Sequence, residues 1–439
     1  MDYVIDTTTE KVNSIGGMAF VGKILEKIGF CKNSGQGTPR HPHVLKSIIG
    51  LFTQGRTHFE EMDIVREDSF FKESLDLTYV PAKETTRLYL ENMIPEQAVV
   101  DAAIETATIR LLKSARLTPI DIDGRTYMPV DIDTSPLDNS KSHKEGVSRT
   151  YKQFDGYHPI FAYIGQEGYM LNTELREGKQ HCQNGTPEFL EHILTLTAQL
   201  AMKEPILFRF DGGNDSKDIL KVLEASGHFY IVKRNLRKEH VEYWLAVAQA
   251  EGVITYEDEA QTVYTGIHTG KKPAGDTSLP DIEIIFQVTE RRIAKDGTHF
   301  LFPEIDIETF WTNLYESPET VLRLYHDHGT SEQFHSELKS DMNIERLPSG
   351  KFAVNAILLK LAMLSFNILR FIGQTALAFP DALPYKTDSK RKRLRKVIDD
   401  LIRVAVKIVT HARRTCIRLW EKDPWLACFR QVYSVCYNL

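Results

Sequence analysis

The sequence has few cysteines, and none of them forms a Cys-x-x-Cys pair. The five cysteines are Cys31, Cys182, Cys416, Cys428 and Cys436. Disulfide frameworks and structural zinc sites both need cysteines at characteristic close spacings. The pattern therefore favours neither, and it is typical of a protein in a reducing compartment such as the cytoplasm.

An overall basic charge, a secretory signal and a clear membrane span are also lacking. The formal net charge of the 439 residues is −6, so any affinity for nucleic acid has to come from local basic segments. The first residues, MDYVIDTTTEK, contain no basic stretch followed by an apolar run. The most apolar stretch, residues 352–373, includes Asn355, Lys360, Asn367 and Arg370. These polar side chains predict a buried helix, and we expect no association with a membrane.

The length exceeds that of one ordinary core, and the sequence pattern divides the chain into segments of different character. Residues 1–118 show apolar residues at helical spacing. Residues 119–239 and 305–375 alternate strands and helices and predict an α/β core, a mixed sheet with flanking helices. Between them, residues 240–304 read as a β-rich insertion without an obvious helix. Residues 376–439 are basic and helical in period.

The first part of the predicted core has a regular order of elements. TYMPVDIDTS, HPIFAYIG and GYMLNTEL read as three successive strands, because they are short and rich in β-branched and aromatic residues. A helix follows, with Thr186 as N-cap and Pro187 as its first residue. The strand PILFRFD, a second helix and the strand HFYIVKRN complete this part. A later helix begins at SPETVLRLYH, with Ser317 as N-cap.

Two aspartates end predicted strands. Asp133 ends VDIDTS and Asp211 ends ILFRFDGGND, and ligands of α/β folds gather at such strand ends. Two aspartates on neighbouring strands can hold one divalent cation, and a third carboxylate can hold a second. Either aspartate alone could instead form a turn or cap a helix. Asp131 shares the face of Asp133 but lies deeper, and Asp215 could cap the next helix.

A third carboxylate lies in the segment YHDHGTSEQFHSELK. On a helix, Tyr325, His328, Glu332 and Lys339 are separated by three, four and seven residues, which places them on one face. Glu337 points elsewhere. The alternative is an ordinary solvated helix face carrying spaced charges.

The order Asp133, Asp211, Glu332, with a β insertion between the last two, resembles the DDE transposases of bacterial insertion sequences. The similarity is greatest to the cut-and-paste group with a Tyr-x2-Arg-x3-Glu-x6-Lys signature. Tyr325, Glu332 and Lys339 match it, whereas His328 stands at the arginine position. The similarity includes FRFDGGND and IVKRNLRKE and covers most of residues 119–420.

This resemblance implies an RNase H-like catalytic core in which Asp133, Asp211 and Glu332 hold two Mg²⁺ ions, for which Mn²⁺ can substitute. It implies DNA strand cleavage and strand transfer, with the transposon terminal inverted repeats and the target DNA as partners. A homodimer on paired ends, in a bacterial cytoplasm and associated with the nucleoid, is expected. One alternative is a metal-dependent nuclease of the same fold that no longer transposes. Another is a catalytically impaired DNA-binding protein, which only His328 favours.

Several residues are candidates for DNA contact. The resemblance implies phosphate contacts from Tyr325 and Lys339, with His328 at the position of a bidentate arginine. Basic segments before the insertion and in the tail can add sequence-independent affinity, although a basic helix can also be merely solubilising. Their candidate residues are Lys233, Arg234, Arg237, Arg391, Lys392, Arg393 and Arg395. The N-terminal helices could recognise the DNA ends by analogy, or could serve as a scaffold.

Two tryptophans are candidates for holding a flipped DNA base. In relatives with a β insertion an aromatic side chain takes this role, and a flipped base needs a stacking partner. Trp244 and Trp311 are the candidates. The alternative for each is an ordinary core tryptophan.

Overall fold

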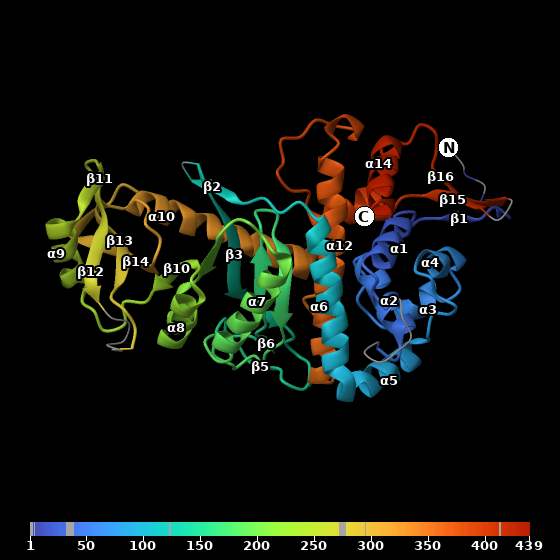
Figure 1. Ribbon diagram of the computed structural model, residues 1–439, viewed down its shortest axis with the longest axis horizontal. Coiled ribbons are helices and arrows are strands. Elements are labelled where there is room, and N and C mark those ends of the chain that lie inside the picture. Colours follow the sequence, from blue (N-terminus) through green and yellow to red (C-terminus); the bar gives the residue numbers. More distant parts are fainter. Residues whose placement is uncertain are drawn as a thin grey trace.

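The computed structural model describes residues 3, 5–31, 39–122, 124–271, 278–294, 296–411 and 414–439. Within these residues a ten-stranded mixed sheet runs through one half of the molecule, in the order β11-β12-β13-β14-β10-β9-β3-β7-β8, with β2 paired to β3 (Figure 1). Its strands are β2 (Ile120–Ile122), β3 (Arg125–Thr134), β7 (Ile160–Ile164), β8 (Tyr169–Glu174), β9 (Ile206–Phe210), β10 (Phe229–Arg234), β11 (Val253–Glu257), β12 (Gln261–Lys271), β13 (Ile282–Ile293) and β14 (His299–Thr312).

The expected α/β core is confirmed. Strand β7 is antiparallel to both β3 and β8, whereas β3, β9 and β10 are parallel to one another. The order β8-β7-β3-β9-β10, with helices α7 (Thr186–Leu200) and α8 (Lys217–Ser226) in the crossovers, is the RNase H-like arrangement. Ser317 caps its helix as predicted and accepts from the Thr320 backbone N–H at 3.3 Å. The predicted cap at Thr186 is wrong. Gly185, at φ +76°, precedes the helix, and Thr186 is already helical.

Successive side chains in the central strands enter two different cores. Phe208 and Val232 belong to the larger core, which also holds residues of α7, α8 and α9. Leu207 and Ile231 point the other way and pack with Leu322 of α10 (Pro318–His326). The two-residue period of a strand explains this division. Alternate residues of these strands therefore place their side chains in alternate cores.

The insertion differs from the expectation in two ways. It begins with a helix, α9 (Val241–Glu251), which packs on strands β12, β13 and β14. It is also not a separate β unit, because β14 pairs with β10 of the core as well as with β13. The boundary expected after residue 304 therefore falls inside one strand. The insertion lengthens the core sheet at the edge that β10 would otherwise form.

The expectation of a helical tail is also wrong in part. Helix α13 (Leu394–Val397) continues as a π-turn to Ile402, and α14 spans Leu426–Tyr437. Between them, β15 (Val406–His411) and β16 (Arg414–Arg418) form a hairpin that pairs with β1 (Val12–Asn13). Val404 and Val406 are buried two residues apart, and β-branched residues at that spacing suit a strand better than a helix.

The N-terminal region is helical, as expected, and the tail packs against it. Near both chain ends the Phe20 and Phe429 rings lie 4.3 Å apart between centroids, and Figure 1 shows the two termini in the same half of the molecule. The helices of this region are α1 (Met18–Lys27), α2 (Pro42–Phe52), α3 (Glu61–Val65), α4 (Ser69–Ser74), α5 (Lys83–Met93) and α6 (Gln97–Ser114).

Helix α12 (Phe352–Leu377) joins the two halves. Its length and composition would suit a membrane span, but most of its residues are buried, as the sequence predicted. It packs against β8, α6 and α2. Its polar residues have partners inside the protein. Asn367 accepts from the Met170 N–H at 2.8 Å and donates to the Met170 carbonyl at 2.7 Å, while Arg370 pairs with Glu337 at 3.1 Å.

We predict that Asn367→Ala lowers the free energy of unfolding by about 2–4 kcal/mol, because it leaves a buried N–H and a buried carbonyl of Met170 without partners. Ser365→Ala is the matched control. The Ser365 hydroxyl is equally buried but donates only to the Leu361 carbonyl at 2.8 Å, so its loss should cost less than about 1 kcal/mol. Chemical denaturation measures both. Equal losses would contradict the role given to Asn367.

Candidate active site

Asp133 and Asp211 lie side by side on one face of the sheet. Strands β3 and β9 are parallel, and Asp131 is the register partner of Arg209. Asp133 and Asp211 each stand two residues further along the chain, so their side chains point to the same face of the sheet as those of Asp131 and Arg209. Adjacent strands are about 4.8 Å apart. The two carboxylates are therefore neighbours where β9 ends, as the sequence predicted.

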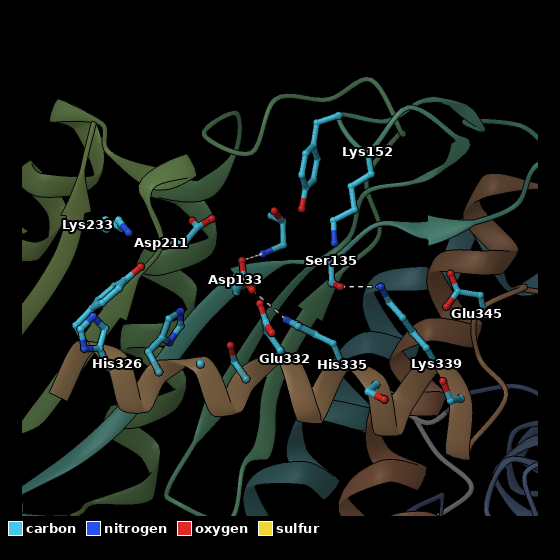
Figure 2. Close-up of a pocket in the computed structure, with 18 of the residues that line it drawn as sticks. Asp133, Ser135, Lys152, Asp211, Lys233, His326, Glu332, His335, Lys339 and Glu345 are labelled. Carbon is cyan, nitrogen blue, oxygen red and sulfur yellow. Dashed lines mark hydrogen bonds and ion pairs between the residues drawn. The ribbon is translucent and has the colours of Figure 1, made fainter. Parts of the chain in front are cut away.

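Glu332 reaches the same place from a helix. After α10 the chain makes a 3₁₀ turn through residues 327–329 and continues as α11 (Thr330–Ser336). Glu332 lines a cleft of about 660 Å³ together with Asp133 and Asp211. Figure 2 shows Glu332 rising from the helix toward Asp133, with Asp211 beyond. Three acids that are distant in the sequence therefore share one cleft.

The two aspartates differ in their surroundings. Burial alone would raise the pKa of Asp133. The hydrogen bond and charge of His335, whose Nε2 lies 3.2 Å from Asp133 Oδ2, act together with the charge of His328 and the backbone hydrogen bond of Thr134, and the pKa is lowered. The Thr134 N–H also donates to this carboxylate at 2.7 Å. Burial, followed by the negative charge of Asp133, raises the pKa of Asp211, although Asn214 donates to it at 2.7 Å. Two neighbouring carboxylates of this kind repel each other.

The acids of the cleft fit a divalent cation by their chemistry. Carboxylate oxygens are the hard ligands that Mg²⁺ and Mn²⁺ take. A cation would relieve the repulsion between Asp133 and Asp211, which adds to the effect of burial in raising the pKa of Asp211. In the part of the chain that the structure describes, no three His, Cys, Asp or Glu side chains are already gathered tightly around one point. Asp133, Asp211 and Glu332 are the residues that would hold the ion, because all three line the cleft. Glu332 would reach the ion from helix α11.

A buried ion pair lies directly beneath these acids. Arg209 donates to both Asp131 oxygens, from Nε at 2.6 Å and from Nη2 at 2.8 Å, and its Nη1 donates to the Leu324 carbonyl at 2.7 Å. His328 Nδ1 lies 3.0 Å from Asp131 Oδ1. The cluster therefore ties β3 and β9 to the helical segment that leads to Glu332. Burial would raise the pKa of Asp131, but Arg209 and His328 lower it to about 2.

Four predicted DNA contacts line the cleft. Lys339 donates to Ser135 Oγ and to the Pro136 carbonyl, both at 2.7 Å, and burial lowers its pKa. Lys233 pairs with Glu308 at 2.6 Å. Tyr325 is half-buried, with its ring 4.6 Å from that of Phe310. His328 also borders the cleft but is buried against Asp131.

The other predicted DNA contacts are engaged within the protein. Arg234 pairs with Glu239 at 2.5 Å, and Arg237 donates to the Asp215 carbonyl at 2.8 Å. In the tail, each of the four predicted contacts meets an acid or a carbonyl near the end of the Glu332 helix or in the tail itself. These contacts are Arg391 with Glu337 at 3.2 Å, Lys392 with Asp400 at 2.8 Å, Arg393 with Asp341 at 2.9 Å and Arg395 with the Ser340 carbonyl at 2.6 Å.

Both tryptophans are buried. Trp244 donates to Glu239 at 2.8 Å, and Trp311 donates to Asp215 Oδ1 at 3.0 Å. The Arg234 guanidinium lies 5.6 Å from the Trp244 ring and 5.0 Å from the Trp311 ring. These contacts are those of core tryptophans, so a flipped base would have to displace protein to reach either ring.

The sequence analysis missed several residues of the cleft, among them His335, Glu308, Tyr151 and Lys152. His335 links Asp133 to the Tyr163 hydroxyl, which lies 3.0 Å from its Nδ1. Glu308 holds Lys233, and Tyr151 and Lys152 enter the cleft from a loop. His335 stands three residues after Glu332, so the helical spacing could have revealed it. Only the three-dimensional structure brings the other three residues to the site.

Comparison with known proteins identifies the family of the chain. The fold is the RNase H-like arrangement, and three carboxylates line one of its clefts. A sequence profile of the family described as transposase DDE domain group 1 matches residues 5–439, so the chain belongs to this family. The protein is thus a member of a family of DNA transposases, which cleave DNA and transfer its strands.

A solved structure also resembles the chain. It is a cryo-EM structure of the piggyBac transposase synaptic complex with hairpin DNA, with a TM-score of 0.43 and 12% sequence identity. The match covers 89% of this chain and 78% of that one. No curated protein matches the sequence.

We predict that Asp131→Asn lowers the free energy of unfolding by about 3–5 kcal/mol, because it leaves Arg209 buried without a counter-charge. Asp155→Asn is the matched control, since its partner Arg149 lies 3.6 Å away and both side chains are largely exposed. That change should cost less than about 1 kcal/mol. Chemical denaturation at neutral pH compares them, and losses within about 1 kcal/mol of each other would refute the stabilising role of the pair.

The Arg209–Asp131 ion pair makes the free energy of unfolding depend on pH. The pKa of Asp131 is lowered to about 2 in the folded protein, against about 3.9 in an unfolded chain. Its contribution is therefore complete above about pH 4 and is lost as the pH falls toward about 2. Denaturation of the wild type between about pH 5 and pH 2 should show this loss. Asp131→Asn should lack that part of the acid sensitivity, and an unchanged pH dependence in the variant would count against the assignment.

Proposed function

We propose that the protein is the transposase of a bacterial insertion sequence, and that it cuts and joins DNA in a cut-and-paste reaction with Asp133, Asp211 and Glu332 as its catalytic acids. The observation that carries the proposal is that these three residues line one cleft. The family membership supplies the DNA chemistry. The reaction class is in-line displacement at phosphorus, first by water and then by the freed 3′-hydroxyl.

In this proposal Asp133, Asp211 and Glu332 would hold two Mg²⁺ ions, for which Mn²⁺ can substitute. When bound, such ions stabilise the attacking and the leaving oxygen of a phosphodiester. The protein residues position the acids. His335 fixes Asp133 through a hydrogen bond, and the Arg209–Asp131 pair holds the two strands and the helix in register. Without these contacts the acids would not keep their common orientation.

Lysines around the acids would hold the DNA backbone. Figure 2 shows Lys152, Lys233 and Lys339 around the labelled carboxylates, each from a different part of the chain. Phosphate groups attract such lysines, and their binding releases counterions. Lys233 is held by Glu308 in the DNA-free protein, so a phosphate would compete with that carboxylate. The natural substrate would be the terminal inverted repeats, held by two copies of the chain.

A DNA-binding protein with weakened catalysis is the second candidate. One observation favours it: the position of the signature arginine holds His328, which is buried against Asp131. A histidine in that place cannot give the bidentate phosphate contact of an arginine. A cleavage assay on the flanking DNA with Mg²⁺ decides between the two candidates, because this second candidate would bind the ends without cutting them.

We predict that Asp133→Ala, Asp211→Ala and Glu332→Ala each reduce cleavage of terminal-repeat DNA by at least about a thousandfold, because each removes a ligand from the metal-binding set. DNA affinity, measured by fluorescence anisotropy in EDTA, should stay within about threefold of the wild type. Glu191→Ala, an exposed acid of α7, serves as the control and should cleave normally. Normal cleavage by any of the three variants would refute the assignment.

We also predict that the apparent affinity for Mg²⁺ falls as the pH is lowered from about 8 to about 5. The pKa of Asp211 is raised by burial and by Asp133, so protons compete with the cation at a higher pH than for an ordinary aspartate. Cleavage measured over a series of Mg²⁺ concentrations at each pH gives the affinity. Excess EDTA should stop the reaction, and added Mn²⁺ should restore it. An affinity that stays constant over this whole range would contradict the proposed role of Asp211.

A further inference from the structure

A short hairpin places two side chains over the candidate active site. Strands β5 (Ser148–Arg149) and β6 (Asp155–Tyr157) belong to a small sheet with β4 (Leu137–Asp138). Their connection is tight, because the Thr150 N–H donates to the Phe154 carbonyl at 2.9 Å. Gln153 adopts φ +65° in this turn. Tyr151 and Lys152 lie at its tip and line the cleft together with Asp133, Asp211 and Glu332.

Tyr151 is exposed although it borders the cleft. Its residue exposure is 60%, so more than half of its surface is free to meet a ligand. The ring of His158 lies behind it, with centroids 5.2 Å apart. His158 is itself fixed by Thr134 Oγ1 and by the Gln180 carbonyl, each at 3.0 Å. The Tyr151 ring is thus supported by a buried residue while much of its surface stays accessible.

The Tyr151 hydroxyl is close enough to the acids to be affected by them. Burial, followed by the charges of Asp133 and Asp211, raises the pKa of Tyr151 to about 12. The phenol is therefore neutral at physiological pH and adds no negative charge to the cleft. Lys152 places its Nζ 5.8 Å from the centre of the Tyr151 ring, and Figure 2 shows it extending into the cleft toward Ser135.

The other aromatic side chains near the site are less accessible. Tyr325 lies 4.6 Å from Phe310 and 5.9 Å from His328, with Lys233 Nζ 5.7 Å from its ring. Trp244 and Trp311 are buried. Among the described aromatic residues that line the cleft, Tyr151 therefore offers the most open ring surface.

We propose that Tyr151 and Lys152 form a nucleotide clamp beside the catalytic acids. The Tyr151 ring stacks on an unpaired nucleobase next to the phosphate that is cut, and Lys152 Nζ binds a neighbouring phosphate. Stacking on an aromatic ring tolerates any base, and it suits a base that has left the duplex. This inference rests on the proposed function to the extent that DNA must enter the cleft.

The clamp can be tested without any cleavage. The probe is a duplex of about 20 base pairs with a single-stranded overhang of about four nucleotides, a length within the range that stacking platforms bind. It carries 2-aminopurine at each overhang position in turn and fluorescein at the far end. The full chain is titrated in EDTA, so the result does not depend on catalysis. Fluorescein anisotropy reports binding, and 2-aminopurine fluorescence reports stacking on the protein.

We expect the wild type to change 2-aminopurine fluorescence at one overhang position. Tyr151→Ala should abolish that change and weaken binding about five- to 150-fold. Tyr151→Phe and Tyr151→Trp, which keep an aromatic ring, should restore it. Lys152→Met should weaken binding and reduce the dependence on salt by about one phosphate contact, while the fluorescence change persists in the saturated complex.

Two controls separate the clamp from trivial effects. Tyr437→Ala removes a tyrosine of similar exposure, 56%, far along the chain, and should behave as the wild type. Tyr151→Leu keeps bulk without aromaticity and stands in for Tyr151→Ala if that variant unfolds at a lower temperature. Retained stacking in Tyr151→Ala or Tyr151→Leu overturns the clamp. Stacking by a wild-type protein that fails to cleave DNA with Mg²⁺ would support the clamp and refute only the proposed catalysis.

Discussion

The ion pair between Arg209 and Asp131 is the contact on which the candidate site depends. It joins β3 to β9 at the register step below Asp133 and Asp211, and it reaches the Leu324 carbonyl of α10. Both side chains are almost completely buried. Ions in such a place are costly unless their geometry is nearly ideal, so the pair allows little change in strand register. The same register of β3 against β9 therefore fixes the positions of Asp133 and Asp211, which stand two residues further along the chain.

The same pair gives a reason for the histidine at position 328. His328 Nδ1 lies 3.0 Å from the Asp131 carboxylate that Arg209 already holds with two hydrogen bonds. An arginine at this position would bring a second permanent guanidinium charge against the same buried carboxylate. A histidine can be neutral and still donate one hydrogen bond. The departure from the signature is therefore compatible with an ordered site, whatever its effect on phosphate contact.

The sequence predicted the local parts of this arrangement well. Strand periodicity placed Asp131 and Asp133 on one face, and helical spacing brought Glu332 to the face that meets them. Both patterns depend on neighbours within a few residues. The continuity of the insertion with the core sheet could not be read in this way, because it depends on the pairing of β14 with β10. The hairpin of the tail was missed because its pairing with Val12 and Asn13 is remote along the chain.

The largest difference concerns the basic residues. In the sequence, the cluster from Lys390 to Lys396 looks like a surface available to DNA, but charge counting does not reveal which cations meet an acid inside the fold. Arg393 meets Asp341, and Lys392 meets Asp400. Arg393 thereby fastens the end of the helix that carries Glu332 to the tail, whereas Lys392 pairs within the tail. Acids of the protein itself thus neutralise much of the charge of these cations.

The positive charge of the cleft is small and comes from three separate segments. Acidic groups outnumber Lys152, Lys233 and Lys339 there, so without a bound cation the acids offset part of the attraction between these lysines and a phosphate backbone. Bound cations would reverse that balance at the acids, while the lysines would act at the rim. Affinity for DNA in this cleft and occupancy by metal would thus be coupled, since each favours the other through the same carboxylates.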